Sequence, residues 1–174
     1  MLFATWGKAF ARKRSFMREL TSPNTTLYTD RESRVINIAL ALLERRVRKL
    51  EAMTSPEVVK AYLRLKLEHI EREVFVAMFL NNQNRLISCE FLFAGTINSV
   101  EVHPGEVARQ AIRLNAAAVI FAHNHPSGNA EPSNADRKIT EKLVDALSLI
   151  EIRVLDHVVV GHGEMVSFAE RGWL

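Results

Sequence analysis

An apolar run that ends in two histidines constrains the fold of this chain more than any other stretch. Residues 116–122 are apolar throughout, and His123 and His125 follow directly. A short continuous apolar run is typical of a buried strand. The histidines then lie where a strand gives way to a loop, which is where catalytic groups are often found on a rigid scaffold. We expect the backbone to turn between the two histidines, so that both imidazoles face one cation.

A third ligand is available downstream. Asp136 lies eleven residues after His125 and offers an anionic oxygen. Two histidines and one carboxylate leave the fourth tetrahedral position of zinc open for water, which distinguishes a catalytic zinc site from a structural one. Zinc in such a site lowers the pKa of its water toward about 7. The pattern therefore predicts a metal-activated water, and hence a hydrolase.

Size and composition indicate one domain in a reducing compartment. The chain has 174 residues, of which 48% are hydrophobic, enough for one sizeable core. It has no apolar run of roughly 18 residues, as a membrane helix needs, and no secretory signal pattern. The single cysteine, Cys89, cannot form an internal disulfide. We therefore expect a cytoplasmic protein without membrane contact.

Positive charge is concentrated at the front of the chain. Residues 1–50 hold 11 Lys and Arg against 4 Asp and Glu, whereas residues 51–174 hold 12 against 16. One cluster consists of Arg45, Arg46, Arg48 and Lys49. Clustered cations bind the phosphates of DNA by releasing counterions. The alternative is the solvated face of an amphipathic helix, and both interpretations stay open.

The periodicity of apolar residues predicts a mixed fold. We expect helices over residues 30–53, from Pro56 onward, over residues 103–114, and from Ser133 onward. Strands are expected over residues 74–80 and 86–93, over the run 116–122, and in a final hairpin of residues 156–160 and 165–168. This order predicts an α+β class, built as a three-layer α-β-α sandwich. The apolar faces of the first two helices can serve a homodimer.

The spacing of the polar residues resembles a known signature. His123-x-His125, seven residues, Ser133, two residues and Asp136 match the JAMM (MPN+/JAB) metalloprotease signature with no gap to adjust. Shorter matches resemble the RadC family, and they lie at residues 93–96, 102–104, 118–128, 155–157 and 167–172.

The resemblance implies a domain organisation. It covers residues 55–174, where we expect a RadC-like sandwich of the JAB/MPN (cytidine-deaminase-like) type. Residues 1–54 would be a basic, mostly helical extension. Full-length RadC proteins carry a helix-hairpin-helix portion thought to contact DNA, and this chain resembles a short form without it.

The resemblance also implies a role for each motif residue. His123, His125 and Asp136 would bind one zinc ion per chain. Ser133 would hydrogen-bond a substrate carbonyl and steady the developing oxyanion. Ser133 also suits the N-cap of the next helix, and the two roles are compatible.

The family uses a glutamate just before its first core strand as the general base. Glu73, directly before the strand expected at residues 74–80, fits that place. Glu71 is the alternative, because a shift of two residues along a strand keeps the same face. Asp156 and His157 either orient a metal ligand or form a buried hydrogen-bonded pair.

Two functions remain open at this point. The first is a zinc-dependent metallopeptidase or other amide hydrolase, in which water attacks a peptide or isopeptide carbonyl. The alternative is an accessory protein in DNA repair or DNA processing, which binds nucleic acid or a partner while the metal site is structural or vestigial.

Overall fold

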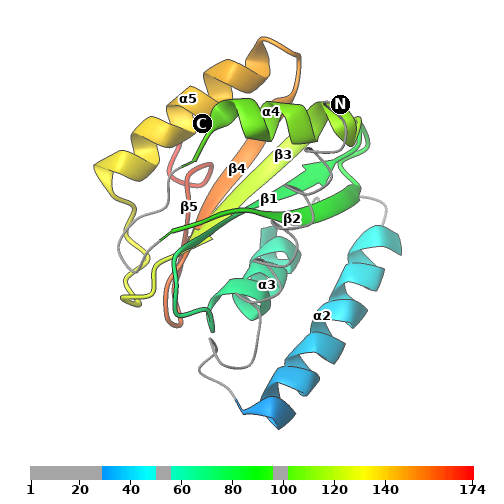
Figure 1. The fold of residues 1–174 in the computed structure, drawn as a ribbon, viewed down its shortest axis with the longest axis vertical. Helices are drawn as coiled ribbons and strands as arrows, with labels where there is room; N and C mark the ends of the chain where they lie inside the picture. The colour runs from blue at the N-terminus through cyan, green and yellow to red at the C-terminus, as the bar shows by residue number, and fades with distance from the viewer. Residues whose placement is uncertain (1–28, 50–55, 96–101) are drawn as a thin grey trace, which may run out of the picture.

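A five-stranded sheet forms the middle of the protein. The computed structural model describes residues 29–49, 56–95 and 102–174 (Figure 1). The strands lie in the order β2-β1-β3-β4-β5. Their bounds are β1 (Val74–Leu80), β2 (Leu86–Ala94), β3 (Ala118–Asn124), β4 (Arg153–Val160) and β5 (Met165–Ser167). The β3–β4 pair is parallel, and the other three pairs are antiparallel.

Helices cover both faces of the sheet (Figure 1). On one face lies α3 (Pro56–Leu67), with α2 (Asp30–Lys49) beside it. On the other face lie α4 (Pro104–Arg113) and α5 (Asn134–Ser148). The expected α+β class and three-layer arrangement are therefore confirmed. None of the helices in the described ranges is long and apolar enough to span a membrane.

The central strand β1 is buried on both faces because its sequence is apolar at every position. Its odd-numbered residues Phe75, Ala77 and Phe79 pack with α4 and α5. Its even-numbered residues pack with α3, among them Val76 and Met78. Burying one large apolar side chain contributes about 1.5–3 kcal/mol. The two clusters therefore fix β1, and with it the neighbouring strand β3, between two helical layers.

The strand that carries the histidines differs from the expectation. We expected residues 116–122 with a turn between the histidines, but β3 runs over Ala118–Asn124. His123 pairs with Phe75 of β1, and Asn124 pairs with Val160 of β4. The backbone stays extended because His123 has strand partners on both sides and Asn124 has one in β4. The two histidines face the same way through the two-residue period of a strand, rather than through a turn.

The other elements lie close to their expected positions. The first helix was expected to reach residue 53; α2 is described to Lys49, and residues 50–53 lie outside the described ranges. The second helix begins at Pro56, as expected. The strand expected at residues 156–160 begins earlier, at Arg153, because β3 offers parallel partners from Ala118 onward.

Two glycines let the loop after His125 lie directly against the turn between β4 and β5. The His162 amide donates to the Gly128 carbonyl oxygen at 2.8 Å. A Cβ atom on Gly161 would lie 2.2 Å from that oxygen and 2.8 Å from the Ala130 nitrogen. Both contacts involve backbone, which cannot swing aside. Gly161 is therefore required by close approach rather than by its own dihedral angles.

We predict that Gly161→Ala destabilises the protein, because overpacking costs about 1–3 kcal/mol. For a chain of this size that corresponds to several degrees of Tm. Gly105→Ala in α4 is the matched control, since nothing lies within 4 Å of a Cβ there. Thermal unfolding followed by circular dichroism measures both. An unchanged Tm in Gly161→Ala would contradict the packing described here.

Candidate metal centre

The fold brings His123, His125 and Asp136 to one point. Their ligand atoms all lie within 4.8 Å of one another. The two Nε2 atoms are 3.0 Å apart. One Asp136 oxygen lies 3.4 Å from His123 Nε2, and the other lies 3.6 Å from His125 Nε2. The three residues come from the end of β3, the loop after it, and the first turn of α5.

These separations fit a small tetrahedral cation. Zinc bonds to nitrogen and oxygen are about 2.0–2.2 Å, so ligand atoms at tetrahedral angles lie about 3.3–3.6 Å apart. The observed separations of 3.0, 3.4 and 3.6 Å bracket that range. His123 is 1% exposed, whereas the side chains of His125 and Asp136 keep 18% and 14% exposure. The cation position is therefore reachable from solvent on one side.

A capping box places Asp136. Ser133 is the N-cap of α5, and its Oγ accepts a hydrogen bond from the Asp136 amide at 3.2 Å. In return, Asp136 Oδ2 accepts from the Ser133 amide at 2.7 Å and from the Ser133 hydroxyl at 2.6 Å. Such reciprocal bonds satisfy amides that the first helical turn leaves open. The same contacts fix the direction of the Asp136 carboxylate.

A chain of hydrogen bonds sets the tautomer of His123. The Thr140 hydroxyl donates to the Asp136 carbonyl oxygen at 2.6 Å, so its only proton is used. Thr140 Oγ1 must then accept from His157 Nδ1, which lies 2.6 Å away. Burial lowers the pKa of His157 well below its ordinary value, so the ring is neutral. Its Nε2 is left as an acceptor for His123 Nδ1 at 2.8 Å, and the His123 Nε2 lone pair points at the centre.

The Asn129 carbonyl sets the tautomer of His125. Its Nδ1 lies 2.8 Å from the Asn129 carbonyl oxygen, which can only accept a hydrogen bond. The proton therefore sits on Nδ1, and Nε2 is free to face the centre. Two lone pairs and a carboxylate that converge in this way repel one another unless a proton or a metal ion lies between them. This donor set fits a bound metal.

The ionisation of the cluster follows from the same contacts. Burial alone would raise the pKa of Asp136, but the contacts with the His123 and His125 rings and the hydrogen bond from Ser133 hold that pKa well below its ordinary value. The hydrogen bond with Asp136 raises the pKa of His125. Metal binding needs neutral imidazoles, so the raised pKa of His125 means that protons compete with the metal at this residue.

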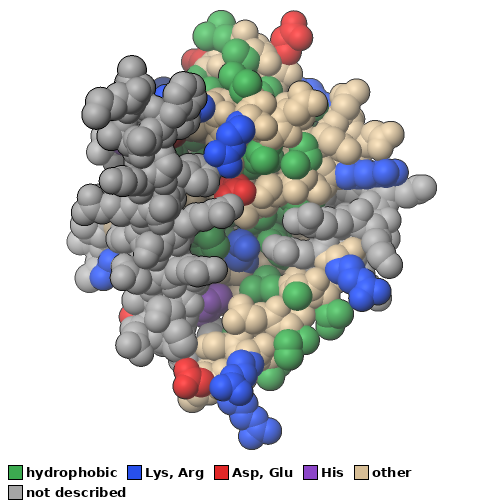
Figure 2. Space-filling model, turned by 45° about the vertical axis from the view of Figure 1, so that its right-hand side comes forward, with side chains coloured by type: hydrophobic (Ala, Val, Ile, Leu, Met, Phe, Trp, Pro, Cys, Tyr) green, Lys and Arg blue, Asp and Glu red, His purple; other side chains and the backbone are tan. Residues whose placement is uncertain are grey.

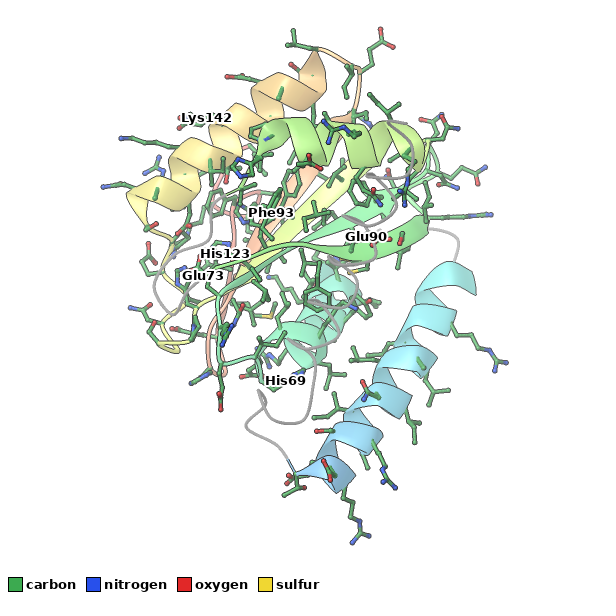
Figure 3. The ribbon with its side chains drawn as sticks, viewed as in Figure 1. His69, Glu73, Glu90, Phe93, His123 and Lys142 are labelled. Carbon is green, nitrogen blue, oxygen red and sulfur yellow. The ribbon has the colours of Figure 1, made fainter. Side chains whose placement is uncertain are left out.

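Glu73 stands beside the cluster, whereas Glu71 does not. Glu73 is half-buried directly before β1, and its charge interacts with those of His123, His125 and Asp136. Figure 3 shows Glu73 and His123 next to each other. Burial raises the pKa of Glu73. Glu71 is exposed in a bend before the strand. Of the two glutamates, Glu73 is thus the one that lies at the cluster, and its role as general base stays a prediction.

Two residues around the cluster were not expected from the sequence. Thr140 completes the bonds to His157, and Asn124 makes buried hydrogen bonds to the segment before β1. A polar residue at an otherwise apolar helix position, one turn after Asp136, was the available signal for Thr140. Of the pair Asp156 and His157, only His157 forms a hydrogen bond with a candidate metal ligand, which is His123. Asp156 accepts hydrogen bonds from the Ser167 hydroxyl and the Ala169 amide.

The expectation that the basic front of the chain binds DNA rests largely on side chains that the structure does not describe. Arg45 is exposed on α2, while the side chains of Arg46, Arg48 and Lys49 lie outside the described part of the chain. Figure 2 shows described Lys and Arg side chains spread around one face rather than gathered in one place. DNA contact and the homodimer stay predictions.

The family follows from sequence comparison. A model described as the RadC-like JAB domain matches residues 53–173, so the chain belongs to the family of RadC-like JAB domain proteins. A UPF0758 protein of Cellvibrio japonicus is 62% identical over 124 residues, which cover 71% of this chain and 55% of that protein. A UPF0758 protein of Vibrio cholerae is 56% identical over 143 residues, which cover 82% of this chain and 90% of that protein. The chain thus spans about half the length of the Cellvibrio relative.

We predict that Thr140→Val weakens metal binding about 10–100-fold, the usual range for residues that orient a metal-bound histidine. The variant keeps the shape of the side chain but leaves His157 Nδ1 without its acceptor. Thr140→Ser, which keeps the hydroxyl, is the matched control. Competition with a chromophoric chelator measures the affinities. Equal affinity in Thr140→Val and wild-type protein would show that the bond to His157 does not orient the ligand.

Proposed function

We propose that this protein is a zinc-dependent amide hydrolase that acts on a peptide or isopeptide bond. The observation that carries the proposal is the convergence of His123 Nε2, His125 Nε2 and the Asp136 carboxylate beside the half-buried Glu73. The resemblance to the JAMM metalloprotease signature supports it. Membership of the RadC-like JAB family supports the kind of domain, and the activity itself is the proposal.

The ligand set favours catalysis over a structural role. When bound, zinc acidifies a water molecule toward a pKa of about 7 and polarises a carbonyl oxygen. His123, His125 and Asp136 would hold the ion and leave one tetrahedral position open. Structural zinc sites use four protein ligands, often cysteines. The only cysteine, Cys89, packs instead against the cluster under α3.

Glu73 would move the proton. Its carboxylate would take a proton from the attacking water and return it to the leaving amine. Because burial raises its pKa, Glu73 is a stronger base than an exposed carboxylate. The efficiency of a general base rises as its pKa approaches the working pH.

Ser133 would act on the substrate carbonyl. Its hydroxyl carries one proton, which it donates to Asp136 Oδ2 in the structure. A hydrogen bond to a substrate oxygen requires that hydroxyl to rotate away from Asp136. The backbone half of the capping box, from the Asp136 amide to Ser133 Oγ, can persist during this rotation.

We predict that Glu73→Gln lowers kcat about 10²–10⁴-fold, the usual contribution of a positioned general base. Zinc content should stay at the wild-type level, since Glu73 is not a ligand. Glu71→Gln is the matched control two residues away and should keep full kcat. The measurement is cleavage of a mixed pool of peptides and isopeptide-linked peptides by the zinc-loaded protein, followed by mass spectrometry. Full activity in Glu73→Gln, or none in the wild-type protein, would contradict the proposed function.

A further inference from the structure

We infer that Asn124, the residue between the two histidines, is a positioning residue that holds Glu73 at the metal centre. The inference rests on the proposed function, in which Glu73 is the general base. His123 and His125 face one side of the extended backbone, and Asn124 faces the other. The amide is 2% exposed, in the layer under α3. It therefore cannot touch a substrate and can act only through the residues that it contacts.

Asn124 binds the backbone on both sides of Glu73. Its Oδ1 accepts from the Val74 amide at 2.9 Å. Its Nδ2 donates to the Ile70 carbonyl at 2.8 Å and to the Arg72 carbonyl at 3.0 Å. The residues directly before and after Glu73 are thus tied to one side chain. That side chain belongs to the strand that carries the ligands.

No other side chain reproduces this set of bonds. One acceptor and two donors on a short stem are needed, and asparagine supplies all three. Aspartate lacks the donors and would set its charge against two carbonyl oxygens. Glutamine is one carbon longer and would force the segment away. Alanine would remove the hydrogen bonds of three backbone groups, two of them buried, and an unpaired buried polar group is costly.

The segment that holds Glu73 needs such support. Residues 71–73 precede β1 and have no strand pairing of their own. One other bond fixes Glu73 itself, from the Gly95 amide to the Glu73 carbonyl at 2.9 Å. A misplacement of about 1 Å in a reacting group can cost roughly 10²-fold in rate. Asn124 and the ligand His123 are neighbours in β3, so the link through Asn124 sets the distance between the Glu73 segment and that ligand.

Asn124→Ala is the test variant, and Asn81→Ala is its matched control. Asn81 lies at the opposite end of β1, where its Oδ1 accepts from the Gln83 and Arg85 amides at 2.9 Å. Both variants remove an asparagine that binds backbone at one end of the same strand. Asn124→Ser is the second variant, for use if Asn124→Ala does not fold.

The kinetic test compares the variants with active wild-type protein. We expect the kcat of Asn124→Ala to fall at least tenfold, while its zinc content and KM stay within about threefold of the wild-type values. Asn81→Ala should keep its kcat. The double variant Glu73→Gln/Asn124→Ala should have the same kcat as Glu73→Gln alone, since the effects of residues that act as a unit are not additive. An additive loss, a loss of zinc, or an unchanged kcat would overturn the inference.

A second measurement needs neither metal nor activity. The Gly95 amide binds Glu73 and is not among the backbone groups that Asn124 contacts, so its hydrogen exchange reports on the Glu73 segment. We expect at least tenfold faster exchange at Gly95 in metal-free Asn124→Ala, and wild-type exchange in Asn81→Ala. Unchanged exchange would overturn the inference even if the enzyme is active. Faster exchange in a protein that cleaves nothing would uphold the link and reject the proposed function.

Discussion

The candidate site depends on β3 staying extended through His123 and Asn124. Pairing with β1 continues to His123 and pairing with β4 continues to Asn124, which keeps the strand extended to its last residue. Alternation then separates two tasks, because one face of the strand carries a metal ligand and the other carries the amide that ties down the segment before β1. If the strand ended before His123, both tasks would fall to a loop, which is a less rigid support.

Hydrogen bonds around the ligands convert this geometry into a site for a cation. Thr140 and His157 fix His123, the Asn129 carbonyl fixes His125, and the capping box of Ser133 fixes Asp136. Each bond leaves an unshared electron pair or a negative charge facing the same point. The buried neutral ring of His157 is the key element, because its Nε2 can accept a hydrogen bond from His123 only while its protonated Nδ1 donates one to Thr140.

Much of this could be predicted from the sequence, where local pattern and tertiary structure agree. The apolar run of β1 gave its bounds correctly, and the spacing from His123 to Asp136 predicted which side chains meet. The predicted turn between the histidines was wrong, since Asn124 at the end of the buried strand still pairs with Val160 of β4. The roles of Thr140 and Asn124 were not predicted, because they depend on contacts between segments far apart in the chain. The periodicity of a sequence does not show such contacts.

The measurement that tests the central claim most directly is elemental analysis of bound metal in wild-type and His123→Ala/His125→Ala protein, both prepared without chelator and then supplied with zinc. The account predicts stoichiometric zinc in the wild-type protein and its loss in the variant, with the fold retained by circular dichroism. A wild-type protein that holds no metal, or a variant that keeps the same zinc, would contradict the metal centre. Stoichiometric iron in place of zinc would keep the site and contradict the choice of metal.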